Sequence, residues 1–219
     1  MTPATEASNV AVTPLNLPGI LNIPDGATGL VIFAHGSGSS RLSPRNTYVA
    51  NALNRAGFAT LLFDLLSPDE EADRANVFDI PLLAERLSAA VAWASGHGRL
   101  RNLPVGLFGA STGAAAALVA AARLGDRVGA VVSRGGRPDL ATAALDEVSA
   151  PTLLIVGSRD PEVLALNEEA LARLPGEKSL KVIAGATHLF EEPGTLDQVV
   201  EEATAWFRRC LGRAAGELR

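Results

Sequence analysis

The sequence predicts an α/β fold: a mostly parallel, doubly wound sheet with helices on both faces. Two patterns support this prediction. Short apolar segments alternate with longer segments of helical periodicity, as parallel strands and their crossover helices do. Most of the apolar segments are apolar on both faces, which is expected of parallel strands covered by helices on each side.

The chain starts with a different pattern. Residues 10–26, "VAVTPLNLPGILNIPDG", contain prolines and a turn, and they predict an antiparallel hairpin at one edge of the sheet. The remaining strands are expected at 29–35, 58–65, 104–109, 128–133, 151–157 and 180–185. Helices are expected at 46–56, 79–96, 112–124, 161–174 and 194–212.

Length and composition indicate one globular domain. The 219 residues suffice for one substantial core, so we expect a single domain over 1–219, with its core at about 10–212 and loose termini. With 47% hydrophobic and 20% charged residues, the chain has the composition of a globular protein. The net charge of −5 and the lack of any basic run argue against nucleic-acid or anionic-membrane partners.

The ends and the single cysteine predict the compartment. The first ten residues have neither a positive start nor an apolar core, so no secretory signal is expected. The longest apolar run, at 114–122, is far short of a membrane span. Because Cys210 is the only cysteine, no internal disulfide can form, and a cytoplasmic location is expected.

Ligands of doubly wound sheets bind beyond the carboxyl ends of the strands. Three of the predicted strand ends carry Ser111 in "GASTG", Asp160 in "SRD" and His188 in "ATHLF". Gly-x-Ser-x-Gly at a strand-to-helix turn, followed in the chain by an acid and then a histidine, is the pattern of α/β hydrolases. We therefore predict Ser111 as nucleophile, His188 as general base and Asp160 as the acid that orients it.

The tetrahedral intermediate of acyl transfer needs backbone N–H donors. The N–H of Thr112 opens the predicted helix after the serine, and the glycine-rich loop "HGSGSS" supplies a second donor, expected from Ser37. His35 is expected to brace this loop, and His97 is expected in a polar loop at the opposite end of the sheet. Asp64 precedes Ser111 in the chain, and a loop-bracing role is expected for it.

Five arginines are also expected at this end of the sheet. Two interpretations stay open: recognition of a substrate carboxylate, or ion pairs with the acidic segment at 67–73 that order the rim. The arginines are Arg41, Arg45, Arg134, Arg137 and Arg159. Cys210 is expected to have no catalytic role.

The motifs "HGSGSS", "GASTG", "VGSRD" and "GATHLF", in this order, resemble those of small α/β hydrolases grouped with dienelactone hydrolase. The stretches "HGSGSSRLSPRN" and "SRGGRPDLA" resemble a subgroup of esterases that occur alone or behind a phosphoribosyltransferase-like domain. The resemblance implies the triad and oxyanion residues above, and a possible phosphoribosyltransferase-like partner, fused or associated. Dienelactone hydrolase itself uses a cysteine nucleophile, so an ordinary carboxylic ester is expected for Ser111.

We therefore predict a serine carboxylesterase for short-chain acyl esters. The segment after the 128–133 strand is too short for a lid, so a shallow, open site is expected. An acyltransferase, a perhydrolase or a dienelactone-type hydrolase could use the same residues. A non-catalytic hydrolase fold would leave the complete triad unexplained, and a dinucleotide-binding turn lacks the Gly-x-Gly-x-x-Gly fingerprint. No cofactor is needed, and no metal ligands have recognisable spacing.

Overall fold

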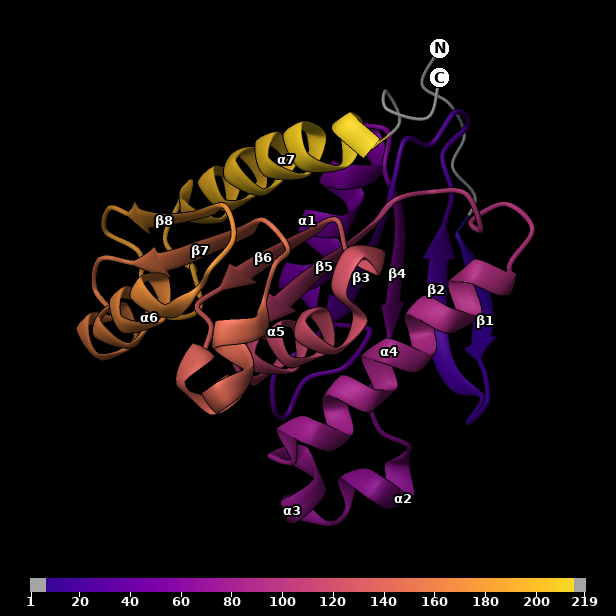
Figure 1. The fold of residues 1–219 in the computed structure, drawn as a ribbon, viewed down its shortest axis with the longest axis horizontal. Coiled ribbons are helices and arrows are strands. Elements are labelled where there is room, and N and C mark those ends of the chain that lie inside the picture. The colour runs from indigo at the N-terminus through magenta and orange to yellow at the C-terminus, as the bar shows by residue number, and fades with distance from the viewer. Residues whose placement is uncertain (1–6, 215–219) are drawn as a thin grey trace.

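Eight strands form one sheet in the order β1-β2-β4-β3-β5-β6-β7-β8, in a computed structural model that describes residues 7–214 (Figure 1). Strands β3 to β8 run parallel, and the antiparallel hairpin β1–β2 joins the sheet beside β4. The predicted fold class and edge hairpin are thereby confirmed. The strands are β1 Ser8–Val12, β2 Leu17–Asn22, β3 Leu30–Ala34, β4 Ala59–Phe63, β5 Val105–Ala110, β6 Ala130–Arg134, β7 Thr152–Gly157 and β8 Lys178–Ile183.

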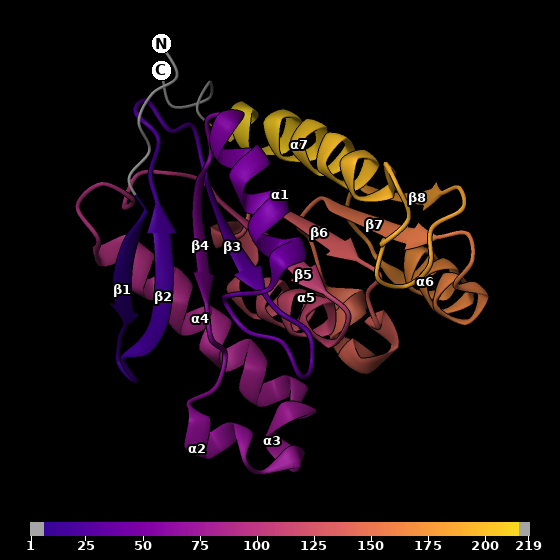
Figure 2. The same ribbon diagram turned by 180° about the vertical axis from the view of Figure 1, so that it is seen from behind.

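Helices cover both faces of the sheet, as Figures 1 and 2 show from opposite sides. Helices α1 and α7 cover one face, and α4, α5 and α6 cover the other. The helices are α1 Pro44–Arg55, α2 Pro68–Glu71, α3 Arg74–Val77, α4 Ile80–Gly96, α5 Thr112–Leu124, α6 Pro161–Arg173 and α7 Thr195–Ala214, with 3₁₀ segments η1 Gly125–Arg127 and η2 Pro138–Glu147. Among these, no helix is both long and apolar enough to cross a bilayer.

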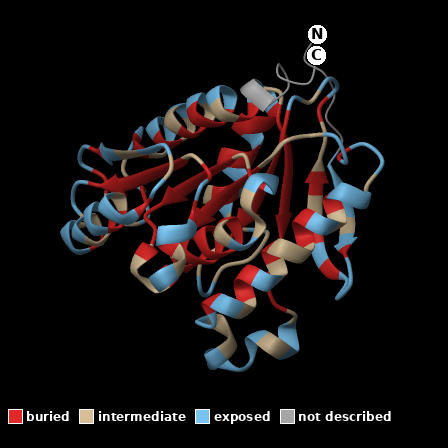
Figure 3. Ribbon diagram, viewed as in Figure 1, coloured by how far each residue is buried: buried red, intermediate tan, exposed pale blue. Residues whose placement is uncertain are grey.

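The core forms two apolar layers, one on each side of the sheet. Leu107 of β5 packs in the layer under α4 and α5, whereas Phe108 packs with Phe33 and Phe207 in the layer under α1 and α7. Because successive strand residues point to opposite faces, a strand that is apolar throughout serves both layers. Figure 3 shows the resulting buried sheet between helices whose outer faces are exposed.

The alanine-rich helix α5 lies tightly against the sheet. Alanines 114–117, 120 and 121 are fully buried, and their small side chains let the helix axis approach the strands closely. The N-terminus of α5 is therefore fixed directly behind the end of β5. This is the junction that carries Ser111.

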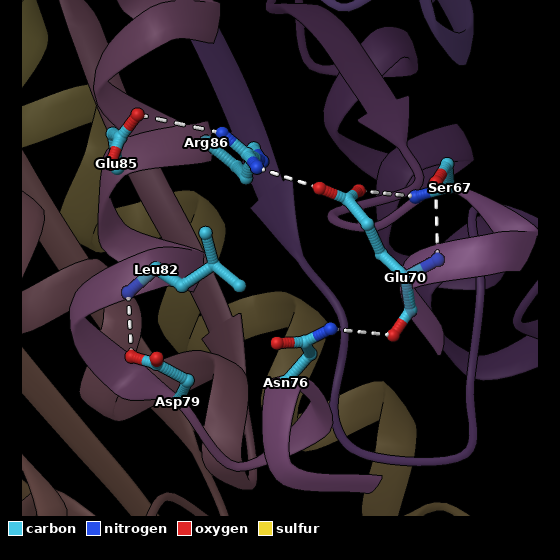
Figure 4. A network of polar contacts seen from close by, with 7 residues as sticks. All are labelled: Ser67, Glu70, Asn76, Asp79, Leu82, Glu85 and Arg86. Atoms are coloured by element: carbon cyan, nitrogen blue, oxygen red, sulfur yellow. Dashed lines mark hydrogen bonds and ion pairs between the residues drawn. The ribbon is translucent and has the colours of Figure 1, made fainter. Parts of the chain in front are cut away.

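Two short helices between β4 and α4 have no counterpart in the sequence prediction. Ser67 and Glu70 form a reciprocal capping box at the start of α2, and Asp73 caps α3 through the Ala75 N–H. Figure 4 shows Glu70 also accepting from Arg86 of α4 at 2.8 Å, while the Asn76 side chain donates to the Glu70 carbonyl at 2.9 Å. These contacts hold the whole 67–77 segment against α4.

Candidate active site

Ser111 stands on a strained turn between β5 and α5. Its backbone has φ 51° and ψ −122°, a combination that non-glycine residues rarely adopt. The glycines on either side allow this turn: a Cβ at Gly109 would lie 2.4 Å from the Cα of Ala114, and one at Gly113 would lie 2.3 Å from the Ala34 carbonyl oxygen. Strand and helix could not approach so closely with larger residues at these two positions.

The structure brings the three predicted side chains together at the carboxyl edge of the sheet. The Nε2 atom of His188 lies 3.3 Å from the Ser111 hydroxyl oxygen, and its Nδ1 atom lies 2.7 Å from Oδ2 of Asp160. The three residues follow β5, β7 and β8, and each is partly buried. Proton transfer from the serine to a carboxylate-oriented imidazole is possible in this geometry.

Asp160 and His188 come from loops that are hydrogen-bonded to one another. The N–H of Arg159 donates to the Ala186 carbonyl at 2.9 Å, and the Gly185 N–H donates to the Ser158 hydroxyl at 2.8 Å. Asp160 is the N-cap residue of α6, yet its side chain makes no capping bond. Its carboxylate is therefore directed to the imidazole.

The two predicted oxyanion donors lie side by side, but one of them is already engaged. Thr112 opens α5, where a helix offers its N–H groups no intrahelical partner. The N–H of Ser37 donates to the Thr112 hydroxyl at 2.9 Å. This bond fixes the 36–40 loop against the nucleophile turn.

The 35–41 loop is also held from the β4 side. The Leu65 N–H donates to Nε2 of His35 at 3.1 Å, so Nδ1 must carry the proton that goes to the Gly36 carbonyl at 3.0 Å. Burial lowers the pKa of His35 and favours this neutral imidazole. Asp64 accepts from the Arg41 N–H at 2.7 Å and pairs with its guanidinium.

Glu192 contributes to the site and was not found from the sequence. Its carboxylate accepts from the N–H of Thr187 at 3.0 Å and lies 4.0 Å from the guanidinium of Arg159. Thr187 precedes His188 in the chain, and Arg159 precedes Asp160. The Thr187 N–H bond lowers the pKa of Glu192, with the Arg159 charge as a weaker cause. No sequence motif predicts this role, because the partner of Glu192 is a backbone N–H, that of Thr187.

Most of the five arginines pair with carboxylates, but not with those of the acidic 67–73 segment. Arg41 pairs with Asp64, Arg45 with Glu191, Arg137 with Asp139 and Arg159 with Glu192. The prediction of rim ion pairs is therefore wrong about the partners. In that segment Glu70 pairs instead with Arg86, which projects from the adjacent helix α4 (Figure 4).

A pocket of about 300 Å³ borders the 35–41 loop on its α4 side. Its apolar wall comes from the hairpin, the end of β4 and the helices α2 to α4. The 135–151 segment contributes nothing to it, since η2 packs against α5 and α6. The apolar lining residues are Pro18, Leu65, Leu66, Pro68, Val77 and Leu83.

His97 and Cys210, for which no catalytic role is expected from the sequence, lie apart from Ser111. His97 caps the C-terminus of α4, before the amino end of β5, and packs against the ring of Trp93. Cys210 lies near the end of α7 and packs against the core layer under that helix.

An open parallel sheet with a strained serine after its central strand is the architecture of α/β hydrolases. The chain belongs to this family: residues 27–209 match the family model described as "Alpha/beta hydrolase domain". Hydrolase chemistry is the activity that this family supports.

Individual proteins resemble this chain in sequence, in structure or in both. A dienelactone hydrolase from Anabaena variabilis is 55% identical, with a TM-score of 0.91, over 96% of this chain and all of that one. Est1E from Butyrivibrio proteoclasticus shares the fold, with 17% identity and a TM-score of 0.79 over 94% of this chain and 99% of its own. A Mycobacterium tuberculosis protein named putative phosphoribosyl transferase is 60% identical over 202 residues, which are 92% of this chain and 46% of that protein. The chain thus spans about half the length of the curated relatives it matches.

Proposed function

We propose that this α/β hydrolase is a serine carboxylesterase that hydrolyses short-chain esters through an acyl-serine intermediate. The observation that carries the proposal is the hydrogen-bonded series Ser111–His188–Asp160 on a strained turn. A serine acquires nucleophilic character from an adjacent base that a third group orients. The three residues have this relationship.

The proposed reaction has two halves. The Ser111 oxygen attacks the ester carbonyl while its proton passes to Nε2 of His188, and Asp160 stabilises the imidazolium through Nδ1. Collapse of the tetrahedral intermediate breaks the bond to the alcohol, which takes the proton from His188 as it leaves. Water then attacks the acyl-serine with His188 again as base, which releases the acid and restores the serine.

The developing oxyanion would be held by backbone donors. The Thr112 N–H is the first, and the Ser37 N–H is the second, shared with the Thr112 hydroxyl that it already contacts. Each such donor contributes roughly 10²–10³-fold to kcat. Proper placement of the 36–40 loop is therefore part of the proposed machinery.

The pocket beside this loop is lined by Ser37 and Gly38 but not by Ser111 or His188, and its size favours small substrates. Its volume of about 300 Å³ is at the lower end of the range for small-molecule sites. We propose that the acyl group enters it across Ser37 and Gly38. Short acyl chains would fill it, whereas long ones would extend into solvent.

Hydrolysis of a nitrophenyl ester series, from acetate to long acyl chains, tests the proposal. We expect preference for short chains and a loss of at least ~10³-fold in Ser111→Ala. The matched control is Ser149→Ala, an exposed serine before β7, which should keep full activity. Unchanged hydrolysis in Ser111→Ala would refute the assignment of the nucleophile.

A phosphoribosyltransferase-like partner, fused or associated, stays a prediction from the resemblance. Affinity purification of the tagged chain from its native cells, with identification of co-purifying proteins, checks it. Recovery of the chain without such a protein would count against a stable association.

A further inference from the structure

Arg134 is a buried cation with no carboxylate partner among the residues that the structure describes. It is the last residue of β6, and only 7% of it is exposed. None of the ion pairs within residues 7–214 includes it, whereas the other four arginines at this end of the sheet are all paired. It is the exception among the five.

The groups around its guanidinium are neutral or positive. One terminal nitrogen lies 3.4 Å from Oδ1 of Asn46, the ring of Phe190 lies 5.9 Å from the guanidinium carbon, and the buried Nε has no hydrogen-bond partner among the described residues. Burial and the nearby Arg45 lower the pKa of Arg134 to about 10. The first turn of α1, which carries Asn46, has no acidic residue and presents the positive end of its helix dipole.

Such an arrangement is costly unless an anion completes it. A buried ion is stabilised chiefly by an opposite charge and by full hydrogen bonding, and a guanidinium has five N–H donors to satisfy. Asn46 and the aromatic face of Phe190 meet only part of this need. The unmet part matches a planar carboxylate, which arginine binds with two parallel hydrogen bonds.

The same residue adjoins the proposed catalytic centre. Its carbonyl accepts the Ser111 N–H at 3.2 Å, and its neighbour Gly135 is so close to His188 that an added Cβ would lie 3.6 Å from Cε1 of the imidazole. Phe190, which faces the guanidinium, is two residues beyond His188. An anion bound at Arg134 would therefore lie beside the reacting ester.

We propose that Arg134, with Asn46 and the first turn of α1, forms a subsite for a carboxylate carried by the substrate. This rests on the proposed function and narrows it to esters that bear a second, ionised carboxyl group. Arg134 acts there as a specificity-determining residue, and the substrate supplies the missing counter-ion.

Paired esters that differ only in the carboxylate test the subsite. Mono(4-nitrophenyl) glutarate is compared with 4-nitrophenyl valerate for a charge on the acyl side, and 4-carboxybenzyl acetate with 4-methylbenzyl acetate for one on the alcohol side. We expect kcat/KM to favour the charged member of at least one pair by roughly ten- to hundredfold, the value of a charge-assisted contact. Preference for the neutral member of both pairs would overturn the proposal.

Two variants probe the guanidinium by different routes. Arg134→Gln removes the charge, and Asn46→Asp places a carboxylate on the atom that Arg134 already contacts, at a helix position where acids are favourable. Both should abolish the preference for the charged ester, and Asn46→Asp should do so without loss of stability. Arg173→Gln, which breaks an exposed pair with Asp146, should keep the preference. A preference that survives in both site variants would refute the role of Arg134.

Calorimetry of glutarate with the Ser111→Ala protein separates this inference from the proposed function. We expect binding that Arg134→Gln and Asn46→Asp each weaken at least tenfold. Binding without any ester hydrolysis by the native protein would sustain the subsite and refute the esterase. Ester hydrolysis by the native protein, without glutarate binding and without any preference for the charged esters, would sustain the esterase and refute the subsite.

Discussion

The Asp160 carboxylate lies 2.7 Å from His188 Nδ1 although Asp160 occupies the N-cap of α6, where it could have bound the helix backbone. Aspartate at an N-cap normally accepts from the N–H of the second or third helical residue. Here the carboxylate makes no such capping bond and faces the imidazole instead. Its contribution to helix stability is therefore small, and its substitution should affect chemistry before folding.

Asp160→Asn should lower kcat by roughly 10³–10⁴-fold, since an amide at this position favours the wrong imidazole tautomer. The unfolding temperature should change little. Steady-state kinetics and thermal unfolding of the same preparations measure both. Asp79→Ala is the control, because Asp79 does cap its helix through Leu82: it should cost about 1 kcal/mol of stability and leave kcat intact. The opposite assignment of effects would contradict the structure.

Thr112→Val keeps the shape of the side chain but removes the acceptor for the Ser37 N–H. The 36–40 loop would lose one hydrogen bond, worth about 1 kcal/mol, so kcat should fall about five- to tenfold. Thr112→Ser retains the hydroxyl and should restore most of the rate. If KM rises instead while kcat stays constant, the hydroxyl serves substrate binding and not the oxyanion loop.

Glu192→Gln should loosen the loop that carries His188, because the ionised carboxylate holds the Thr187 N–H. We expect kcat to fall by about tenfold, with a small effect on KM. The native pKa of Glu192 is lowered, so its stabilising effect is present above the ordinary value of 4.5 and is lost as the pH falls through the lowered one. As the pH falls, the free energy of unfolding should therefore decrease less for the variant than for the native protein. Glu191→Gln, which is more exposed and pairs with Arg45, is the control.

A second pH effect is expected from His35, whose charged form, and not its neutral form, is disfavoured in the native protein. Burial lowers its native pKa below 6.5, so the unfolded chain binds a proton that the native protein refuses. Native stability should therefore decline as the pH drops from about 7 through 6.5 and level off near the lowered value. Urea unfolding of the native protein and of His35→Gln over this range measures it, and the variant should lack this part of the slope. His97→Gln should retain it; an unchanged slope in His35→Gln would show that another group is responsible.

Much of the fold was predictable because its signals are local. Each apolar segment and each helical segment named from the sequence became an element within a few residues of the expected bounds, since parallel strands and covering helices have distinct patterns. Helices α2 and α3 were missed, although Ser67 and Glu70 show the spacing of a capping box. Four-residue helices lack the periodicity on which the prediction relied.

The candidate site was predictable to the extent that its residues follow strands. Ser111, Asp160 and His188 were found because the carboxyl ends of parallel strands share one edge, whereas their catalytic roles stay predictions. Glu192 acts through a backbone N–H, which no residue type reveals. The ion-pair partners of the arginines were predicted wrongly. Whether two loops meet, as those of Arg41 and Asp64 do, depends on how each loop turns after its strand.

The position of β8 has a consequence for how activity is lost. This strand lies at one edge of the sheet, with no other described strand beyond it, and five of its six residues are exposed or partly exposed. Edge segments open with less free energy than central ones. His188 follows this strand, whereas Ser111 follows a strand in the middle. A brief detachment of β8 would separate the base from the nucleophile while the rest of the sheet stayed intact. On heating, hydrolytic activity should therefore be lost at a lower temperature than that of global unfolding.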